Sequence, residues 1–144
     1  MGQHVLVPVD GSDPAKKAFD YVIDELVDPE ITLINVINPV GALGYADEDH
    51  FDIEGYRQAE ARQREMAEDL FEEFKERADG SDVDIDTEIR IGKPSRQILS
   101  FTEENDIDHI VMGSHGRTGA GRVLFGSVAE AVTRRSPVPV TIVR

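Results

Sequence analysis

Short apolar runs of strand length alternate along the chain with segments in which apolar residues recur every three or four positions. Continuous or period-two apolar runs predict strands, whereas a spacing of three and four predicts helices. Five strands are expected, at residues 4–9, 30–37, 83–91, 109–112 and 138–143. Four helices are expected, at residues 14–26, 55–78, 95–105 and 123–135. This alternation is typical of βαβ units and predicts an α/β fold, in which helices cover both faces of a parallel sheet.

Three segments refine this expectation. Residues 10–14 (DGSDP) predict a turn, with Asp13 as the N-cap of the first helix and Pro14 at its first helical position. Residues 83–91 alternate strictly with charged positions, which predicts one poorly covered face, as at a sheet edge. Residues 38–54 are Gly-rich and acidic without a period, and we interpret them as a mobile connection.

The length of 144 residues fits one domain spanning residues 1–144, because no repeat or linker interrupts the pattern. Right-handed crossovers bring the carboxyl ends of parallel strands to one edge of the sheet. We therefore expect Val9, Ile37 and Met112 to lie along a shared edge. Ligands of such sheets bind outside that edge, at the point where the strand order reverses.

The composition is strongly acidic, with 15 Lys and Arg against 29 Asp and Glu and a formal charge of −14. This excess argues against general nucleic-acid binding, which depends on clustered Lys and Arg. The absence of cysteine excludes disulfides, Cys-ligated zinc, iron–sulfur clusters and a cysteine nucleophile. Because Lys is also rare beside Arg, we hypothesise a halophilic protein, in whose high-salt cytosol screening removes the self-repulsion. An ordinary acidic soluble protein is the alternative.

The beginning of the chain predicts no targeting signal. It lacks the basic and apolar regions of a signal peptide, and Leu6 stands where a myristoylation motif requires Ser or Thr. No run approaches the roughly 18 apolar residues of a membrane-spanning helix. We expect a cytoplasmic protein without a membrane partner.

The strongest chemical signal is the glycine-rich segment at residues 113–122 (GSHGRTGAGR), followed by Gly126 and Ser127 at the final helix. Glycine permits close approach of a ligand to backbone N–H groups, and a helix start adds unpaired donors. These features predict an anion cradle, most naturally for phosphate; a flexible surface turn is the alternative. The spacing is not that of a Walker A motif, and Leu124 replaces the third glycine of a dinucleotide fingerprint.

The glycines follow the order Gly, two residues, Gly, nine residues, Gly, Ser, at Gly113, Gly116, Gly126 and Ser127. Together with VPVDGS at residues 7–12 and the strand–helix order of nearly the full chain, this pattern resembles the ATP-binding branch of the universal stress protein family. The resemblance implies a Rossmann-like (adenine nucleotide alpha hydrolase-like) fold, with an open five-stranded parallel sheet in the order 3-2-1-4-5, and a homodimer. It also implies ATP or a related adenine nucleotide, with Mg or Mn bound through the phosphates.

The same resemblance implies roles for individual residues. Adenosine would be bordered by Pro8, Val9 and Asp10, and adenine would contact the main chain of Val36. The ribose would lie near Met112 and Gly113. The phosphates would be surrounded by Ser114, His115, Gly116, Gly126, Ser127 and Val128. We add Arg117 and Arg122 on electrostatic grounds, as charge partners of the phosphates. No protein ligand to a metal is assigned.

Some of these residues also have a plainer interpretation. Asp10 fits an Asx turn before a helix, and His115 fits an ordinary loop position. Residues 47–52 (DEDHFD) offer oxygen and imidazole donors to a metal, but they lack the spaced acids and glycine of a calcium loop. We favour a solvated run of charges for this segment.

Three functions remain open. The first is an ATP-binding stress-response or signalling protein with at most slow hydrolysis, in which nucleotide occupancy alters a dimer surface or residues 38–54. The second is a genuine ATPase or nucleotidyl transferase; against it, no convincing nucleophile or general base accompanies the loop, so no catalytic residue is assigned. The third is a dimeric interaction scaffold that needs no nucleotide.

The apolar terminal strand predicts how a dimer forms. Residues 138–143 would leave hydrogen-bonding groups exposed if they ended the sheet. The resembled family pairs two copies through this strand, and we expect a symmetric contact that involves Val138, Val140 and Ile142. Pro139 is expected to limit ladder bonding to one side of the strand.

The halophile hypothesis predicts a higher unfolding temperature in molar KCl than in dilute buffer. Salt shortens the Debye length from about 30 Å at 0.01 M to about 3 Å at 1 M, which weakens repulsion among the excess carboxylates. Thermal denaturation followed by circular dichroism at the two concentrations measures the difference. Equal stability in both buffers would contradict the hypothesis.

Overall fold

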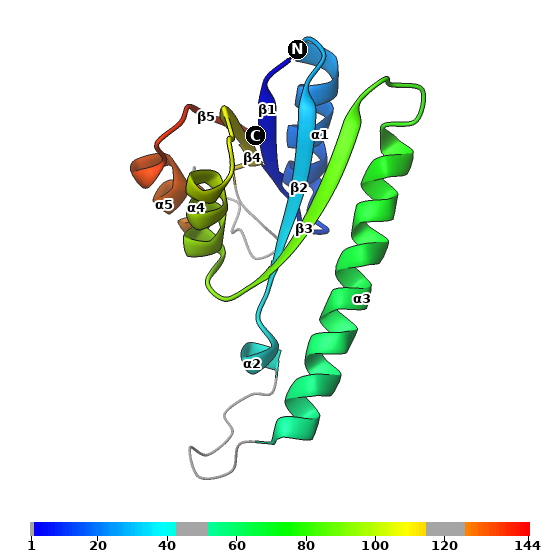
Figure 1. Ribbon diagram of the computed structural model, residues 1–144, viewed down its shortest axis with the longest axis vertical. Helices are drawn as coiled ribbons and strands as arrows, with labels where there is room; N and C mark the ends of the chain where they lie inside the picture. Colours follow the sequence, from blue (N-terminus) through cyan, green and yellow to red (C-terminus); the bar gives the residue numbers. More distant parts are fainter. Residues whose placement is uncertain (1, 43–51, 115–125) are drawn as a thin grey trace.

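The computed structural model describes residues 2–42, 52–114 and 126–144. The strands are β1 (His4–Pro8), β2 (Glu30–Ile37), β3 (Asp84–Ile91), β4 (His109–Gly113) and β5 (Val140–Val143). The helices are α1 (Asp13–Glu25), α2 (Pro39–Ala42), α3 (Ile53–Arg77), α4 (Pro94–Glu104) and α5 (Ser127–Arg135). Figure 1 shows the sheet in the middle of the molecule, with α1 and α3 on one side and α4 and α5 on the other.

The five predicted strands and the four long helices are confirmed, with small shifts at their ends. The short helix α2 was not predicted and lies in the segment that the sequence indicated as a connection. Residues 43–51 of that segment lie outside the described part of the chain. The prediction that the last helix begins at residue 123 also falls partly on residues outside the description, and α5 begins at Ser127.

The predicted N-cap of α1 was wrong by one residue. Ser12, not Asp13, has the extended backbone of a cap, and its hydroxyl accepts a hydrogen bond from the Ala15 N–H at 3.3 Å. Asp13 is the first residue of the helix, where its carboxylate interacts favourably with the positive end of the helix dipole. Pro14 follows in the first turn, where no intrahelical partner for an N–H is lost.

All strands are parallel and lie in the order β3-β2-β1-β4-β5, which confirms the expected topology. The strand order reverses at β1, because β2 lies on one side of it and β4 on the other. The carboxyl ends of β1, β2 and β4 therefore share one edge of the sheet, as predicted. The alternating strand β3 lies at a border of the sheet, also as predicted.

Two apolar cores cover the two faces of the sheet. Alternate residues of a strand point to opposite faces, so Val5 and Val7 of β1 pack toward α1 and α3, while Leu6 packs toward α4 and α5. On the first face the rings of Phe19 and Phe74 meet edge to face, with centroids 5.1 Å apart. The second core contains Leu6, Ile34, Ile98, Phe101, Ile110 and Val132.

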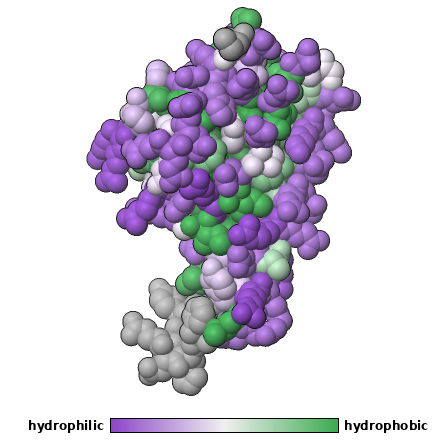
Figure 2. All heavy atoms as spheres, in the orientation of Figure 1, coloured by the Kyte–Doolittle hydropathy of each residue, from purple (hydrophilic) through white to green (hydrophobic). Residues whose placement is uncertain are grey.

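The surface that Figure 2 presents is mainly hydrophilic, in keeping with the charge of the chain. Apolar patches interrupt it, and the exposed large apolar side chains among the described residues include Val40, Ile53 and Met66. Within the described ranges, no helix combines the length and the apolar character needed to cross a bilayer.

A histidine links three segments at the amino-terminal border of the sheet. His109 begins β4, and its Nε2 lies 2.7 Å from the Thr141 hydroxyl of β5. Its Nδ1 lies 3.2 Å from Oε1 of Gln3, just before β1. Burial lowers the pKa of His109 below its ordinary value of 6.5, because a partly buried ring is less able to hold a charge.

This lowered pKa predicts that His109 makes folding weaker in acid. Below about pH 6.5 the ring of the unfolded chain takes up a proton more readily than the folded ring, so stability falls as the pH decreases; above that pH the contribution is constant. We expect His109→Gln to reduce the loss of stability between pH 7.5 and pH 5. Urea denaturation at several pH values measures the slope, and a slope equal to that of the wild type would contradict the prediction.

Candidate functional site

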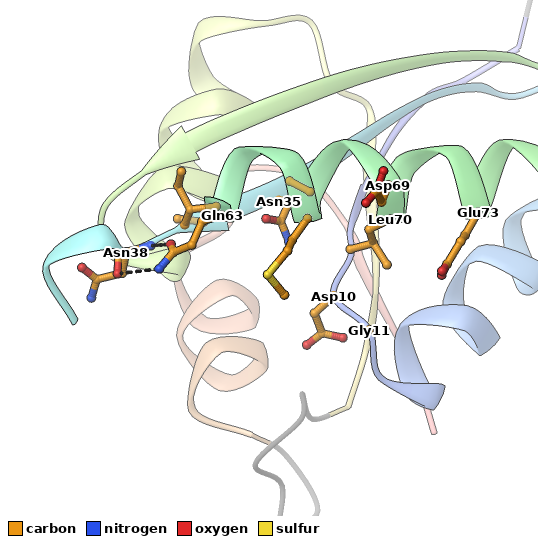
Figure 3. Close-up of a pocket in the computed structure, with 12 residues that line it drawn as sticks. Asp10, Gly11, Asn35, Asn38, Gln63, Asp69, Leu70 and Glu73 are labelled. Carbon is orange, nitrogen blue, oxygen red and sulfur yellow. Dashed lines mark hydrogen bonds between the residues drawn. The ribbon is translucent and has the colours of Figure 1, made fainter. Parts of the chain in front are cut away.

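A pocket of about 640 Å³ lies where the ends of β1 and β2 face α3. Figure 3 shows Asp10 and Gly11, which follow β1, across from residues of α3. The lining comprises Asp10, Gly11, Asn35, Val36, Ile37, Asn38, Gln63, Met66, Ala67, Asp69, Leu70 and Glu73. This position at the carboxyl edge of a parallel sheet is the one that such folds use for ligands.

Local hydrogen bonds fix the end of β1. The Val9 N–H donates to the Ile34 carbonyl at 2.9 Å, which extends the contact with β2 by one residue. The Asn35 amide donates to the Val9 carbonyl at 2.8 Å, so the chain direction after β1 is held from β2. The Asp10 carboxylate accepts from the Ser12 N–H at 2.9 Å, which confirms the Asx turn that the sequence allowed. Asp10 therefore lines the pocket in a fixed position.

The end of β2 is held by α3. The Gln63 side chain accepts from the Asn38 N–H at 3.0 Å and donates to the Asn38 carbonyl at 3.3 Å. Figure 3 shows this pair of bonds. The Gln63 amide satisfies the backbone N–H and carbonyl of Asn38, as a neighbouring strand would do in a sheet. In addition, the Gly92 N–H donates to the Ile37 carbonyl at 3.0 Å. The main chain around Val36 is thus tied on both sides.

The end of β4 is packed against the start of α1. A Cβ atom at Gly113 would lie 2.6 Å from Cβ and 2.7 Å from the carbonyl carbon of Pro14, closer than atoms can approach. Gly113 is therefore required by the contact between β4 and α1. This packing role was not predicted, because the sequence pattern indicated only a ligand site.

The start of α5 is connected to the end of β4. The Ser114 N–H donates to the Val143 carbonyl at 2.9 Å, and the Ser114 carbonyl accepts from the Gly126 N–H at 2.6 Å. Gly126 has φ −70° and ψ 164°, and α5 begins at the next residue. The first N–H groups of α5 have no intrahelical acceptors and carry the positive end of the helix dipole, so they suit an anion.

The predicted site residues fall into three groups. Asp10 and Val36 are brought together as lining of the pocket, with Pro8 and Val9 in the chain that leads to it. Met112 and Ser114 are buried, Gly113 contacts Pro14, and Gly126, Ser127 and Val128 form the start of α5. The remaining four, His115, Gly116, Arg117 and Arg122, lie outside the described residues.

The α3 side of the pocket was missed by the sequence analysis. Gln63, Met66, Leu70 and Glu73 recur at intervals of three and four residues, so they lie along one side of the helix. The spacing was a usable signal. Leu70 packs partly against the core as well as lining the pocket, and helical spacing alone gave no reason to expect open space beside that side of α3.

The described lining of the pocket is polar and acidic around a few apolar side chains. It contains the carboxylates of Asp10, Asp69 and Glu73 and no Lys, Arg or His. Carboxylates repel a phosphate, so the described lining favours a neutral or hydroxyl-rich group. A phosphate is better placed at the start of α5.

Metal ligands do not converge anywhere in the described ranges, which hold no group of three or more His, Cys, Asp or Glu side chains able to bind an ion. The acidic segment at residues 47–52 lies outside them except for Asp52, which is the N-cap of α3.

Comparison with known proteins assigns this Rossmann-like fold to a family. The whole chain, residues 1–144, matches the sequence profile of the Universal stress protein family. It is 31% identical over 142 residues to a universal stress protein, MJ0531, of Methanocaldococcus jannaschii, an alignment covering 97% of this chain and 81% of that protein. A putative universal stress protein of Staphylococcus saprophyticus is 31% identical over 144 residues, with 97% and 82% covered. The chain belongs to the universal stress protein family.

Solved structures confirm the fold. The universal stress protein UspA from Lactobacillus plantarum superposes with a TM-score of 0.83 at 25% identity, covering 99% of this chain and 97% of the other. The hypothetical protein MJ0577 superposes with a TM-score of 0.82 at 28% identity, covering 98% and 94%.

Proposed function

We propose that the protein binds an adenine nucleotide, ATP in the first instance, at the carboxyl edge of its sheet. The observation that carries the proposal is the placement of Asp10 and Val36 in one pocket at this edge. Universal stress proteins of the same fold have been solved with cAMP, with AMP in a protein from Arabidopsis thaliana, and with dAMP in one from Archaeoglobus fulgidus. These are 24%, 19% and 19% identical to this chain, and they support the proposal through the shared fold.

The proposed orientation places the two halves of the nucleotide in different surroundings. The nucleoside occupies the pocket, with its base against the main chain of Val36 and its ribose near Asp10. The phosphates extend toward Gly126 and Ser127, where the first N–H groups of α5 lack intrahelical acceptors and favour an anion. His115, Gly116, Arg117 and Arg122 complete the phosphate site in this proposal, as the resemblance and their charge suggest.

A divalent ion fits this site as a companion of the phosphates. Asp10 is the one predicted site residue with a carboxylate, and one of its oxygens already accepts the Ser12 N–H. Among the described residues no group of three or more possible ligands converges, so we propose no cation site independent of the nucleotide. Mg or Mn would be held through phosphate oxygens and would neutralise part of their charge.

The proposed physiological role is a nucleotide-dependent stress-response or signalling dimer. Binding affects function only if the nucleotide has different affinities for two conformations of the protein. Because the pocket contacts both α3 and the end of β2, a bound nucleotide has the means to favour one arrangement of these elements. We assign no catalytic residue, and the expected ATPase activity is at most slow.

The binding proposal predicts that ATP with magnesium titrates into the nucleotide-free protein with micromolar or tighter affinity in molar KCl. Gly126→Val is expected to weaken binding at least tenfold, because a branched side chain would crowd the phosphates at the start of α5. The backbone of Gly126 lies in the extended region that valine adopts readily. Isothermal titration calorimetry measures both affinities.

Thermal denaturation of Gly126→Val provides the control, since an unchanged unfolding temperature assigns the loss to the site. A folded, nucleotide-free wild type without detectable ATP binding would overturn the proposal. It would favour instead the dimeric scaffold that needs no nucleotide.

A symmetric dimer through β5 is the second part of the proposal. This strand ends the sheet. The Pro139 carbonyl accepts from the Ile110 N–H of β4. Because the N–H and carbonyl of one strand residue point to the same side, proline's missing N–H costs no hydrogen-bond donor on the outer edge of β5. The side chains of Val138, Val140 and Ile142 pack partly against the protein's own core, and pairing would therefore use mainly the backbone of the outer edge.

The dimer proposal predicts a particle of twice the chain mass of 16.0 kDa at micromolar concentration. Ile142→Pro removes an outward backbone donor while the bonds to β4 at neighbouring positions remain, and we expect it to shift the protein toward monomer. Light scattering coupled to size-exclusion chromatography measures the mass. Circular dichroism checks that the variant is folded, and a monomeric wild type would refute the proposal.

A further inference from the structure

One side of α3 is open toward the candidate nucleotide pocket instead of being packed on the sheet. Phe71 and Phe74, in the second half of the helix, are buried in the core against the sheet. Before Phe71 the buried positions of the helix are the small residues Ala59 and Ala67. The rings of Phe71 and Phe74 fill the space between the helix and the sheet. An alanine side chain is too small to do so, and the pocket lies beside Ala67.

Met66 is the exposed apolar residue on this wall. It lines the pocket, yet 56% of its surface is accessible to water. Leu70, one helical turn further on, also lines the pocket and is only half-buried. A thioether side chain adapts its shape to a flat ring, and both residues present apolar surface that water would leave when a base covers it.

Carboxylates flank this apolar surface. Glu73 lies one turn beyond Leu70, and Figure 3 shows both side chains extending from α3 toward the side on which Asp10 lies. Glu73 is exposed and forms no ion pair within the described part of the chain. The α3 wall thus offers an apolar patch for a ring and negative charge beside it.

The wall is also held at a fixed position relative to β2. Gln63, one turn before Met66 and Ala67, binds both the N–H and the carbonyl of Asn38. These two bonds hold the end of β2 beside the wall in the conformation described. Val36 and α3 line the same pocket, so a ring held against the main chain of Val36 would lie within reach of α3.

We infer that α3 is a specificity-determining wall of the nucleotide site: Met66 and Leu70 hold the base, and the phosphates lie away from Glu73. This inference rests on the proposed function and extends it to residues outside the glycine-rich pattern. It explains how a pocket with three carboxylates takes up part of an anionic ligand, because only the uncharged half enters. The order of the ligand along the site then follows from apolar contact at α3 and from the N–H groups at the start of α5.

The test compares the affinities of adenosine, AMP and ATP for the full chain and its variants by calorimetry. Met66→Ala is expected to weaken all three ligands by the same factor, about fivefold, because it removes apolar contact with the part that they share. Met66→Leu should restore most of the affinity. Ile53→Ala is the matched control, since Ile53 lies on the same helix, is 57% exposed and does not line the pocket.

Glu73→Lys tests the orientation. With the phosphates at α5, reversing this charge should change adenosine affinity little and raise ATP affinity by no more than about threefold at 0.1 M salt, where the Debye length is about 10 Å. A gain of tenfold or more for ATP alone would mean that the phosphates lie against α3 and would overturn the inference.

The two proposals fail in different ways. If the wild type binds none of the three ligands, both the nucleotide site and its α3 wall are refuted. If the wild type binds them and Met66→Ala behaves like Ile53→Ala, the nucleotide site stands and only the role of α3 is refuted. Because Met66 is exposed, its replacement is expected to leave the fold intact, and thermal denaturation verifies this.

Discussion

The central position of β1 is the constraint on which the rest of the structure depends. This strand pairs with β2 on one side and β4 on the other, and its side chains are buried on both faces. A parallel strand in this position requires crossover connections on both faces of the sheet, which places two helices on each. It also requires that the strand order reverse beside it. The chain that leaves β1 therefore emerges where neighbouring connections diverge and a ligand has access.

Two close contacts convert this opening into a shaped site. At the end of β4, Gly113 allows Pro14 to approach the backbone, so the start of α1 lies against the sheet. At the end of β2, Gln63 binds the Asn38 backbone from the side of α3. The first contact needs the absence of a side chain and the second needs one particular amide. Between them, the turn at Asp10 is closed by its own hydrogen bond to Ser12.

The sequence predicted the layers of this protein better than it predicted the pocket wall. A mainly apolar run such as that of β2 indicates burial on two faces, and the predicted bounds of this strand were confirmed. The four-residue helix α2 left no periodic signal, because one turn does not repeat. Leu70 fits the apolar stripe of α3 and packs partly against the core, yet it also lines the pocket. Whether such a residue also meets a cavity depends on how the helix packs on the sheet, which the period of its apolar residues does not encode.

The charges of the candidate site differ between its two ends. A chain with a formal charge of −14 repels an anionic ligand at long range, so affinity for a nucleotide must come from short-range donors and apolar contact. The described pocket lining provides apolar surface and carboxylates but no cation. The start of α5, tied to Ser114 at the end of β4, provides backbone N–H groups that carry no counter-charge of their own. An acidic protein of this fold is thus suited to a ligand whose uncharged and anionic halves bind to separate elements.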